Sequence, residues 1–207
     1  MERISELMQI SYKHELNALR NQINPHFLFN MLNNINHLVR TRPEQANEVI
    51  SKLSGFLRHQ IYRTDDEHVQ LSSEIEFLEN FLDLEKIRRD HFSITTQISN
   101  LDKDQRAIDA IFLPANLFTT FVENAVKHSV SLSDAETFIR LDFIIHSKTL
   151  EFICTNSKDN EYAVESKDSG VGLATMRKRL DLIYAKDYQL TIDNREEEFV
   201  VKLILPV

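Results

Sequence analysis

The 207-residue sequence is poor in cysteine, glycine and proline, and it has no excess of basic residues. Its single cysteine, Cys154, excludes an intramolecular disulfide and fits a reducing compartment. The formal net charge of −8, without a run of Lys and Arg, argues against nucleic acid as a direct partner. No apolar stretch reaches the roughly 18 residues of a membrane span, and residues 1–9 do not resemble a signal peptide. A membrane or sensory segment upstream, in a longer parent chain, stays open.

The first part of the chain has a helical pattern. Apolar residues recur at three- and four-residue spacing, which predicts helices over residues 16–38, 49–61 and 72–89, with a turn at 41–44. Two such helices cannot enclose a core alone, but four can, so the pattern predicts a homodimer through residues 1–65.

The pattern changes near residue 91, where apolar and polar residues begin to alternate. One strand is expected at 91–99, and two strand pairs follow. The two pairs cover residues 139–145 with 150–154, and 188–193 with 199–205. Two helices interrupt them, one from Pro114 and one over residues 173–184. The sequence therefore predicts an α+β fold with a mostly antiparallel sheet.

Glycine is concentrated at one place, because two of the three glycines form Gly170-Val171-Gly172. Glycine lets backbone N–H groups approach an anion without a Cβ in the way. The helix expected from Leu173 would add its N-terminus, which favours negative charge. Although a G-x-G sequence before a helix is common, the segment is a candidate phosphate-binding site.

His26 lies in an unusual setting. Asn24 followed by Pro25 is typical of a helix start, and His26 would then be an ordinary first-turn residue. The apolar stripe that includes Leu16 lies upstream, however, so Pro25 would kink a continuing helix, a costly feature that suggests a functional site. Asn30, one turn further on, is placed to orient the imidazole and leave one nitrogen free as a nucleophile.

The helix expected from Pro114 gathers Glu123, Asn124, Lys127 and His128 opposite its apolar face. One interpretation is an ion pair between Glu123 and Lys127 on a solvated surface. The other starts from Asn124, a poor helix former whose carbonyl oxygen suits Mg²⁺. Lys127 and His128 are then candidate donors to substrate phosphates.

Asn156 follows an apolar strand and begins the polar segment 157–169, which is expected to be a mobile loop. It is either a turn-forming residue or an acceptor for the amine of a base.

Segments 22–30, 122–128 and 169–173, in this order, resemble the LytS-type sensor histidine kinases. The similarity also includes residues 53–58, 74–88 and 179–180, so it extends over nearly the whole chain from about residue 16. The second and third segments resemble the nucleotide site shared by gyrase, Hsp90, histidine kinase and MutL proteins, the GHKL or Bergerat fold.

The resemblance implies a helical dimerisation and phosphotransfer domain over residues 1–90, containing a helical hairpin. An ATP-binding catalytic domain, a two-layer α/β sandwich, would occupy residues 91–207. ATP and Mg²⁺ would be required, and His26 would accept the γ-phosphoryl group. Glu123 would help to polarise the attack, and Asn124 would hold Mg²⁺. Residues 157–169 would form a lid, and the segment Gly170-Val171-Gly172-Leu173 would line the phosphates.

The resemblance also implies partners and a location. The phosphoryl group would pass to an aspartate of a response regulator, of the kind with a LytTR-type DNA-binding domain. The chain as given would be cytoplasmic, and its parent would lie on the cytoplasmic face of the bacterial inner membrane.

Three positions depart from patterns frequent in histidine kinases. Asn156 stands where many have Asp-x-Gly-x-Gly, Thr175 where Asn is frequent, and Phe27 where an acid often follows the phosphoacceptor. The sequence therefore does not identify the base that activates His26. Two other functions stay open: a degenerate kinase acting as a non-catalytic binding or scaffold module, and another ATPase of the same fold.

Overall fold

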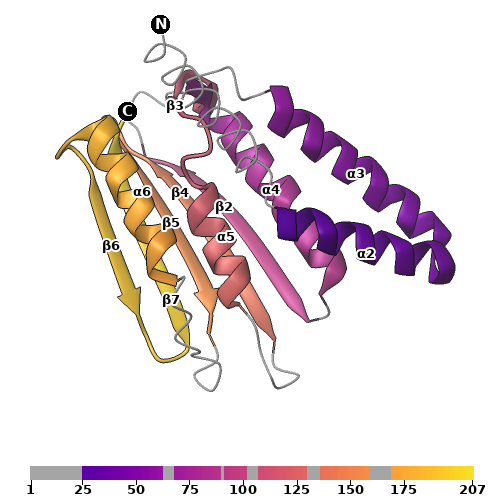
Figure 1. Ribbon diagram of the computed structural model, residues 1–207. Helices are drawn as coiled ribbons and strands as arrows, with labels where there is room; N and C mark the ends of the chain where they lie inside the picture. Colours follow the sequence, from indigo (N-terminus) through magenta and orange to yellow (C-terminus); the bar gives the residue numbers. More distant parts are fainter. Residues whose placement is uncertain (1–24, 63–67, 90, 102–106, 130–135, 159–168) are drawn as a thin grey trace, which may run out of the picture. The chain divides into compact units, whose positions relative to one another are not determined.

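The computed structural model describes residues 25–62, 68–89, 91–101, 107–129, 136–158 and 169–207 (Figure 1). The chain divides into two compact units, residues 1–65 and 66–207. The sequence predicted a functional boundary between residues 90 and 91, whereas the compact units divide between 65 and 66. The helix over residues 71–88 therefore belongs to the second unit, and the functional division stays a prediction.

The first unit contains a helical hairpin, made of α2 (Pro25–Thr41) and α3 (Pro43–Tyr62). Both α2 and α3 begin with a proline, whose fixed φ and missing N–H cost little at the first position of a helix. The rings of Phe27, near the start of α2, and Phe56, late in α3, have centroids 5.2 Å apart, so the helices run antiparallel. The predicted helical residues before Pro25 lie outside the described residues.

One apolar stripe from each helix is buried in this hairpin. The stripes have the three- and four-residue spacing predicted from the sequence. Their buried residues are Phe27, Met31 and Leu38 of α2 with Ala46, Val49, Leu53 and Phe56 of α3.

The second unit is built on a five-stranded sheet with the order β2-β4-β5-β7-β6. The strands are β2 (Phe92–Asn100), β4 (Thr137–Ile145), β5 (Thr149–Ser157), β6 (Gln189–Asn194) and β7 (Glu198–Pro206). Only β2 and β4 pair in parallel, and the other neighbours are antiparallel. The predicted strand at 91–99 and both predicted strand pairs are confirmed.

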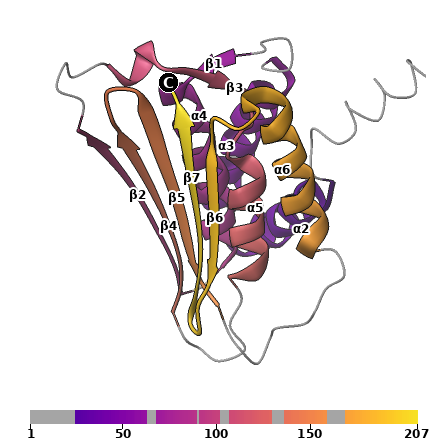
Figure 2. The same ribbon diagram turned by 90° about the vertical axis from the view of Figure 1, so that its left-hand side faces the viewer.

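Three helices cover one face of this sheet: α4 (Leu71–Arg88), α5 (Thr119–His128) and α6 (Ser169–Tyr184) (Figure 2). Alternate residues of β4 and β5 are buried against them, as expected for a sheet with one covered face. The centre of the core is aromatic, since the ring centroid of Phe118 lies 4.4 Å from that of Phe152 and 5.5 Å from that of Phe143. This two-layer α+β sandwich is the predicted fold class.

The prediction that α5 starts at Pro114 is wrong. Pro114 ends the short strand β3 (Phe112–Pro114), which pairs with β1 (His68–Gln70), a strand that the sequence pattern did not indicate. The turn η2 (Ile108–Ala110) precedes β3. Asn116 follows with a positive φ of 57°, a conformation that Asn tolerates, and α5 begins only at Thr119.

The glycine segment also differs from the prediction. Helix α6 begins at Ser169, so Gly170 and Gly172 lie in its first turn instead of in a loop before it. No described glycine has a positive φ. An unusual backbone conformation therefore does not account for these glycines, and their surroundings are considered below.

Candidate functional site: the α5–α6 junction and the end of β5

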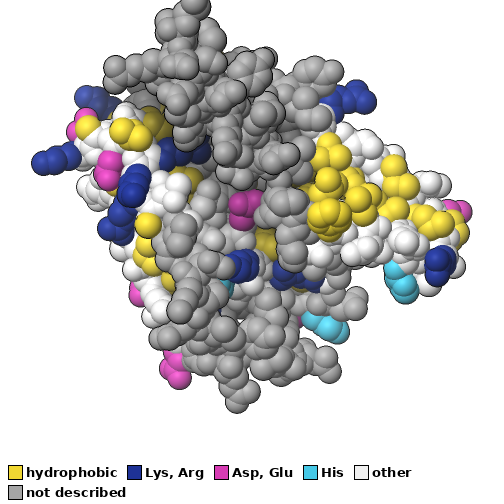
Figure 3. All heavy atoms as spheres, viewed as in Figure 1, with side chains coloured by type: hydrophobic (Ala, Val, Ile, Leu, Met, Phe, Trp, Pro, Cys, Tyr) yellow, Lys and Arg dark blue, Asp and Glu magenta, His cyan; other side chains and the backbone are white. Residues whose placement is uncertain are grey.

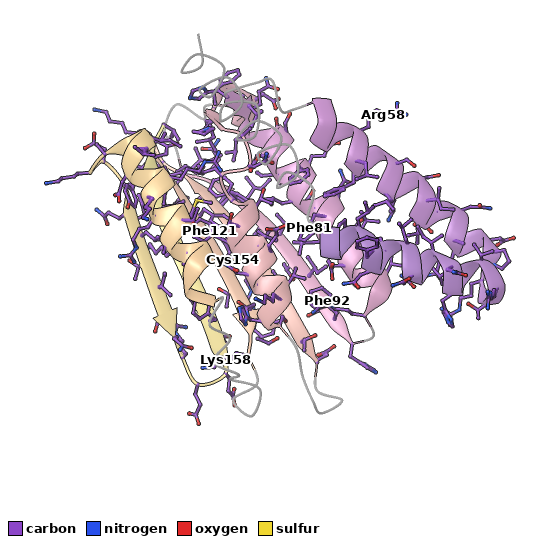
Figure 4. All side chains as sticks on the ribbon, viewed as in Figure 1. Arg58, Phe81, Phe92, Phe121, Cys154 and Lys158 are labelled. Carbon is purple, nitrogen blue, oxygen red and sulfur yellow. The ribbon has the colours of Figure 1, made fainter. Side chains whose placement is uncertain are left out.

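The two faces of α5 differ as the sequence predicted. Phe121, Val122, Ala125 and Val126 are buried. Glu123 and Asn124 are partly exposed, whereas Lys127 and His128 are exposed in the last turn. Figure 4 labels Phe121 on α5 and Cys154 on β5, two of the side chains buried between the helices and the sheet. The polar residues predicted for the site therefore lie on the outer face of α5.

Helix α6 approaches α5 at Gly172. A Cβ added to Gly172 would lie 3.6 Å from Nδ2 and 3.7 Å from Oδ1 of Asn124, and 3.8 Å from Cγ2 of Thr120. The first turn of α6 is thus held against the Asn124 side chain, whose Nδ2 is buried at this contact. The fold brings together two of the three segments that the sequence analysis selected.

The side chain of Asn124 suits a hard cation. Its Nδ2 is buried and has no hydrogen-bond partner among the described residues. The amide is therefore not used to stabilise the fold, and its carbonyl oxygen is the type of ligand that Mg²⁺ prefers.

The surroundings of His128 favour its neutral imidazole. Partial burial, and then the positive charge of Lys127, lower the pKa of the His128 imidazole from its ordinary value of 6.5. A neutral imidazole offers a phosphate one N–H donor and no positive charge. Of the two predicted phosphate donors, Lys127 is thus the one whose positive charge does not depend on this shift.

Asn156 lies on the covered face of the sheet. The alternation along β5 buries Phe152, Cys154 and Asn156 on the same side, and only 1% of Asn156 is exposed. Its Nδ2 donates a hydrogen bond of 2.8 Å to the carbonyl oxygen of Ser157. This bond directs the donor of the amide back to the protein and leaves Oδ1 as the group with acceptor capacity.

The end of β5 is joined to the end of α5. The hydroxyl oxygens of Ser129 and Ser157 are 3.0 Å apart, and the backbone N–H of Phe138 donates to Ser157 Oγ at 2.9 Å. Asn156 is therefore next to the end of the helix that carries Lys127 and His128. The predicted lid, residues 157–169, lies almost entirely outside the described residues.

His26 and Asn30 lie in the first two turns of α2, in the other compact unit. Their spacing of four residues places them one turn apart on the same side of the helix. The side chain of His26 is outside the described part of the structure, so the predicted hydrogen bond between Asn30 and its ring stays a prediction.

The sequence analysis did not recognise the role of Arg179, a half-buried residue of α6. Its guanidinium donates to the carbonyl oxygens of Ala115 (2.6 Å) and Asn116 (3.0 Å). These bonds hold the turn before α5 against α6. Arg179 lies in the segment 179–180 that carries part of the resemblance, but nothing in the sequence indicated this contact.

Solved structures show to which class this fold belongs. The histidine kinase domain of the blue-light activated histidine kinase EL346 from Erythrobacter litoralis has a TM-score of 0.50, covers 93% of each chain and is 12% identical. A structure described as a bacterial phosphotransferase also has a TM-score of 0.50, with 10% identity and coverage of 90% of this chain and 95% of that one. The second unit has the GHKL-type fold of histidine kinase catalytic domains.

The sequence comparisons identify the family. A family model described as histidine kinase matches residues 14–92. The sensor protein LytS of Streptococcus mutans is 28% identical over 204 residues, which is 93% of this chain and 34% of LytS. The sensor histidine kinase YpdA of Escherichia coli is 30% identical over 89% of this chain and 33% of YpdA. The chain is therefore similar to the LytS-type sensor histidine kinases over most of its length, and its first part matches the histidine kinase family model.

The chain spans about a third of the length of the curated relatives that it matches. Within the described residues, no helix has the length and apolar character needed to cross a bilayer.

Proposed function

We propose that this chain is the catalytic portion of a two-component sensor histidine kinase. The second unit binds ATP and Mg²⁺, and His26 of the first unit receives the γ-phosphoryl group. The contact between Gly172 and the Asn124 amide carries the proposal, because it makes one site of two segments that are 48 residues apart in the sequence. The family relationship supports the same assignment.

The nucleotide would be held at both of its ends. Asn156 Oδ1 accepts a hydrogen bond from the exocyclic amine of adenine, because the Nδ2 of this residue is occupied by Ser157. The first turn of α6, Gly170-Val171-Gly172-Leu173, faces the phosphates with backbone N–H groups. Lys127 adds a positive charge, and His128 adds one N–H donor.

The metal would be held by Asn124, together with water and phosphate oxygens. Bound Mg²⁺ would neutralise charge on the phosphates and so favour attack at the γ-phosphorus. Glu123, the neighbouring residue on the outer face of α5, would help to polarise the attack of the imidazole.

The phosphotransfer is an in-line displacement. A nitrogen of the His26 imidazole attacks the γ-phosphorus, an N–P bond forms, the bond to the β–γ bridging oxygen breaks, and ADP leaves while the ring proton goes to solvent. Asn30 orients the ring through its other nitrogen. An aspartate oxygen of a response regulator then attacks the phosphorus, which releases free His26.

The hairpin would form a homodimer. A second apolar stripe on α2, composed of Phe29, Leu32 and Val39, is exposed (67%, 49% and 53%), and Ile50 of α3 is exposed as well (42%). Figure 3 shows hydrophobic side chains gathered over this hairpin. Two copies that join these stripes would form a four-helix bundle and remove the apolar surface from water.

The response regulator is the expected acceptor, and one with a LytTR-type domain fits the LytS relatives. The parent protein would lie on the cytoplasmic face of a bacterial inner membrane, with its sensor in the portion that the relatives have and this chain does not span.

The test is incubation with γ-labelled ATP and Mg²⁺. Wild type should acquire acid-labile label. His26→Gln should acquire none, and Asn124→Ala should lose nearly all of it. His37→Gln is the matched control, because His37 is an exposed histidine of the same helix.

Other outcomes identify the alternatives. Label that survives in His26→Gln contradicts the phosphoacceptor assignment. Nucleotide binding without labelling favours the degenerate module, and multiple turnover of ATP that does not need His26 favours another ATPase of this fold.

A further inference from the structure

A buried carboxylate of α4 holds the turn before α5. Glu74, in the first turn of α4, is completely buried. Its Oε2 accepts from the backbone N–H of Asn116 at 3.2 Å, and its Oε1 accepts from the N–H of Phe118 at 3.5 Å. A buried carboxylate is stable only when such donors compensate for its lost hydration. The start of α5 is thus fixed to the start of α4.

A cation just beyond the other end of α4 holds the end of α5. Arg89 donates from Nη2 to the carbonyl oxygen of Val126 at 2.9 Å and from Nη1 to that of Ser129 at 2.8 Å. It also lies 3.4 Å from the carboxylate of Glu85, which is 3% exposed. The last turn of α5, which carries Lys127 and His128, is thus fixed to the end of α4.

These contacts make α4 a brace that runs parallel to α5. Glu74 in the first turn of α4 contacts the turn just before α5, and Arg89 just after α4 contacts the last turn of α5, so the two helices run in the same direction. The signs of the charges also match the helix dipole, with an anion at the start of α5 and a cation at its end. Asn124 lies between the two fixed ends.

The sequence contains a sign of this arrangement. Glu74 and Glu85 occupy the same face of α4 as Leu71, Leu78 and Leu82, where an apolar residue is the norm. Acidic residues in an apolar stripe are costly unless a specific partner compensates for their burial.

We propose that α4 positions the nucleotide-binding helix α5 through Glu74 and Arg89. In that role both are positioning residues, since neither touches the substrate. For nucleotide binding the inference rests on the proposed function; for the placement of α5 it rests only on the contacts above.

The experiment compares two variants, each with a matched control. Glu74→Gln is paired with Glu76→Gln, and Arg89→Gln with Lys86→Gln, because Glu76 and Lys86 are exposed charges of the same helix. Two measurements are made well below the Tm of each variant. The first is amide hydrogen exchange over residues 116–129, without nucleotide. The second is the labelling kinetics with ATP and Mg²⁺.

Glu74→Gln and Arg89→Gln should each raise exchange in 116–129, with little change in β4, β5 and β7. Each should raise the KM for ATP about tenfold, the effect of losing about one charge-assisted hydrogen bond, while kcat changes less. Both control variants should match wild type in exchange and in KM.

Two results overturn the proposal. One is exchange in 116–129 equal to that of the controls. The other is a general loss of stability with an unchanged KM, which would mean that Glu74 and Arg89 only stabilise the core. If wild type neither binds nor labels with ATP, the proposed function fails, and the exchange measurement alone still decides whether α4 holds α5.

Discussion

The backbone of Gly172 lies against the side-chain amide of Asn124, close enough that an added methyl group would be in van der Waals contact with it at 3.6 Å. That distance leaves room for a methyl group without moving the backbone. Steric necessity therefore does not explain the glycine at this position.

Gly172→Ala should separate stability from binding. Alanine favours a helix over glycine by up to about 1 kcal/mol, so the Tm should stay equal or rise. Under the proposed function phosphate and Mg²⁺ bind beside Asn124, and the methyl group would crowd them there, so the affinity for ATP should fall about tenfold, the loss expected from one contact to a charged group. Calorimetric titration and thermal unfolding measure the two effects.

The control for this substitution is Gly55→Ala. Gly55 lies in α3 and has nothing within 4 Å of an added Cβ. It should give the same gain in stability with unchanged ATP affinity. Equal ATP affinity in Gly172→Ala and wild type would argue that the phosphates bind elsewhere.

Asn156→Asp should destabilise the protein, although many histidine kinases have an acid at this place. The Nδ2 of Asn156 donates to the carbonyl oxygen of Ser157, and an aspartate would set a second acceptor against that oxygen in a buried position. Losing a buried hydrogen bond in this way costs about 1–3 kcal/mol. Urea unfolding at pH 7 measures it, and unchanged stability would contradict the proposed orientation of the amide.

The Cys154 thiol should stay unreactive in the native protein. Burial, and secondarily the charge of Asp142, raise the pKa of the Cys154 thiol to about 12. A thiol reagent at pH 8 should therefore modify Cys154 only at the rate of unfolding. Rapid modification of the folded chain would show that β5 opens locally.

The same shift predicts how stability changes with pH. The folded pKa is raised above that of the unfolded thiol, so the contribution of Cys154 is fully present below about pH 8.5 and is lost above it. From there towards pH 12 the free energy of unfolding should fall by about 1.4 kcal/mol per pH unit. Other groups titrate in this range, so the difference from Cys154→Ala isolates this slope.

Phe29→Asp should weaken the homodimer. Burial of such a side chain contributes about 1.5–3 kcal/mol, so its loss should raise the dimer dissociation constant at least about tenfold. Sedimentation equilibrium at micromolar concentration measures this change. Ser51→Asp, on an exposed position of α3 away from the buried stripe, is the control and should stay dimeric. A wild-type chain that is monomeric under these conditions would contradict the dimer.

Local sequence patterns determined which residues form most of the elements. The apolar spacing of Met31 and Leu38 defines a helix because residues three, four and seven apart share a face. Alternation in β4 and β5 defines strands for the corresponding reason, with a period of two. The order of the three motif segments also indicated the histidine kinase family before any contact was known.

Tertiary structure decided where α5 and α6 begin and what meets at the site. Pro114 resembles a helix start, but pairing of β3 with β1 and the positive φ of Asn116 move the start of α5 to Thr119. The contact of Gly172 with Asn124 and the burial of Glu74 join residues more than 40 positions apart. Local propensity carries no information on such partners, because they are set by how α4, α5 and α6 pack on one face of the sheet.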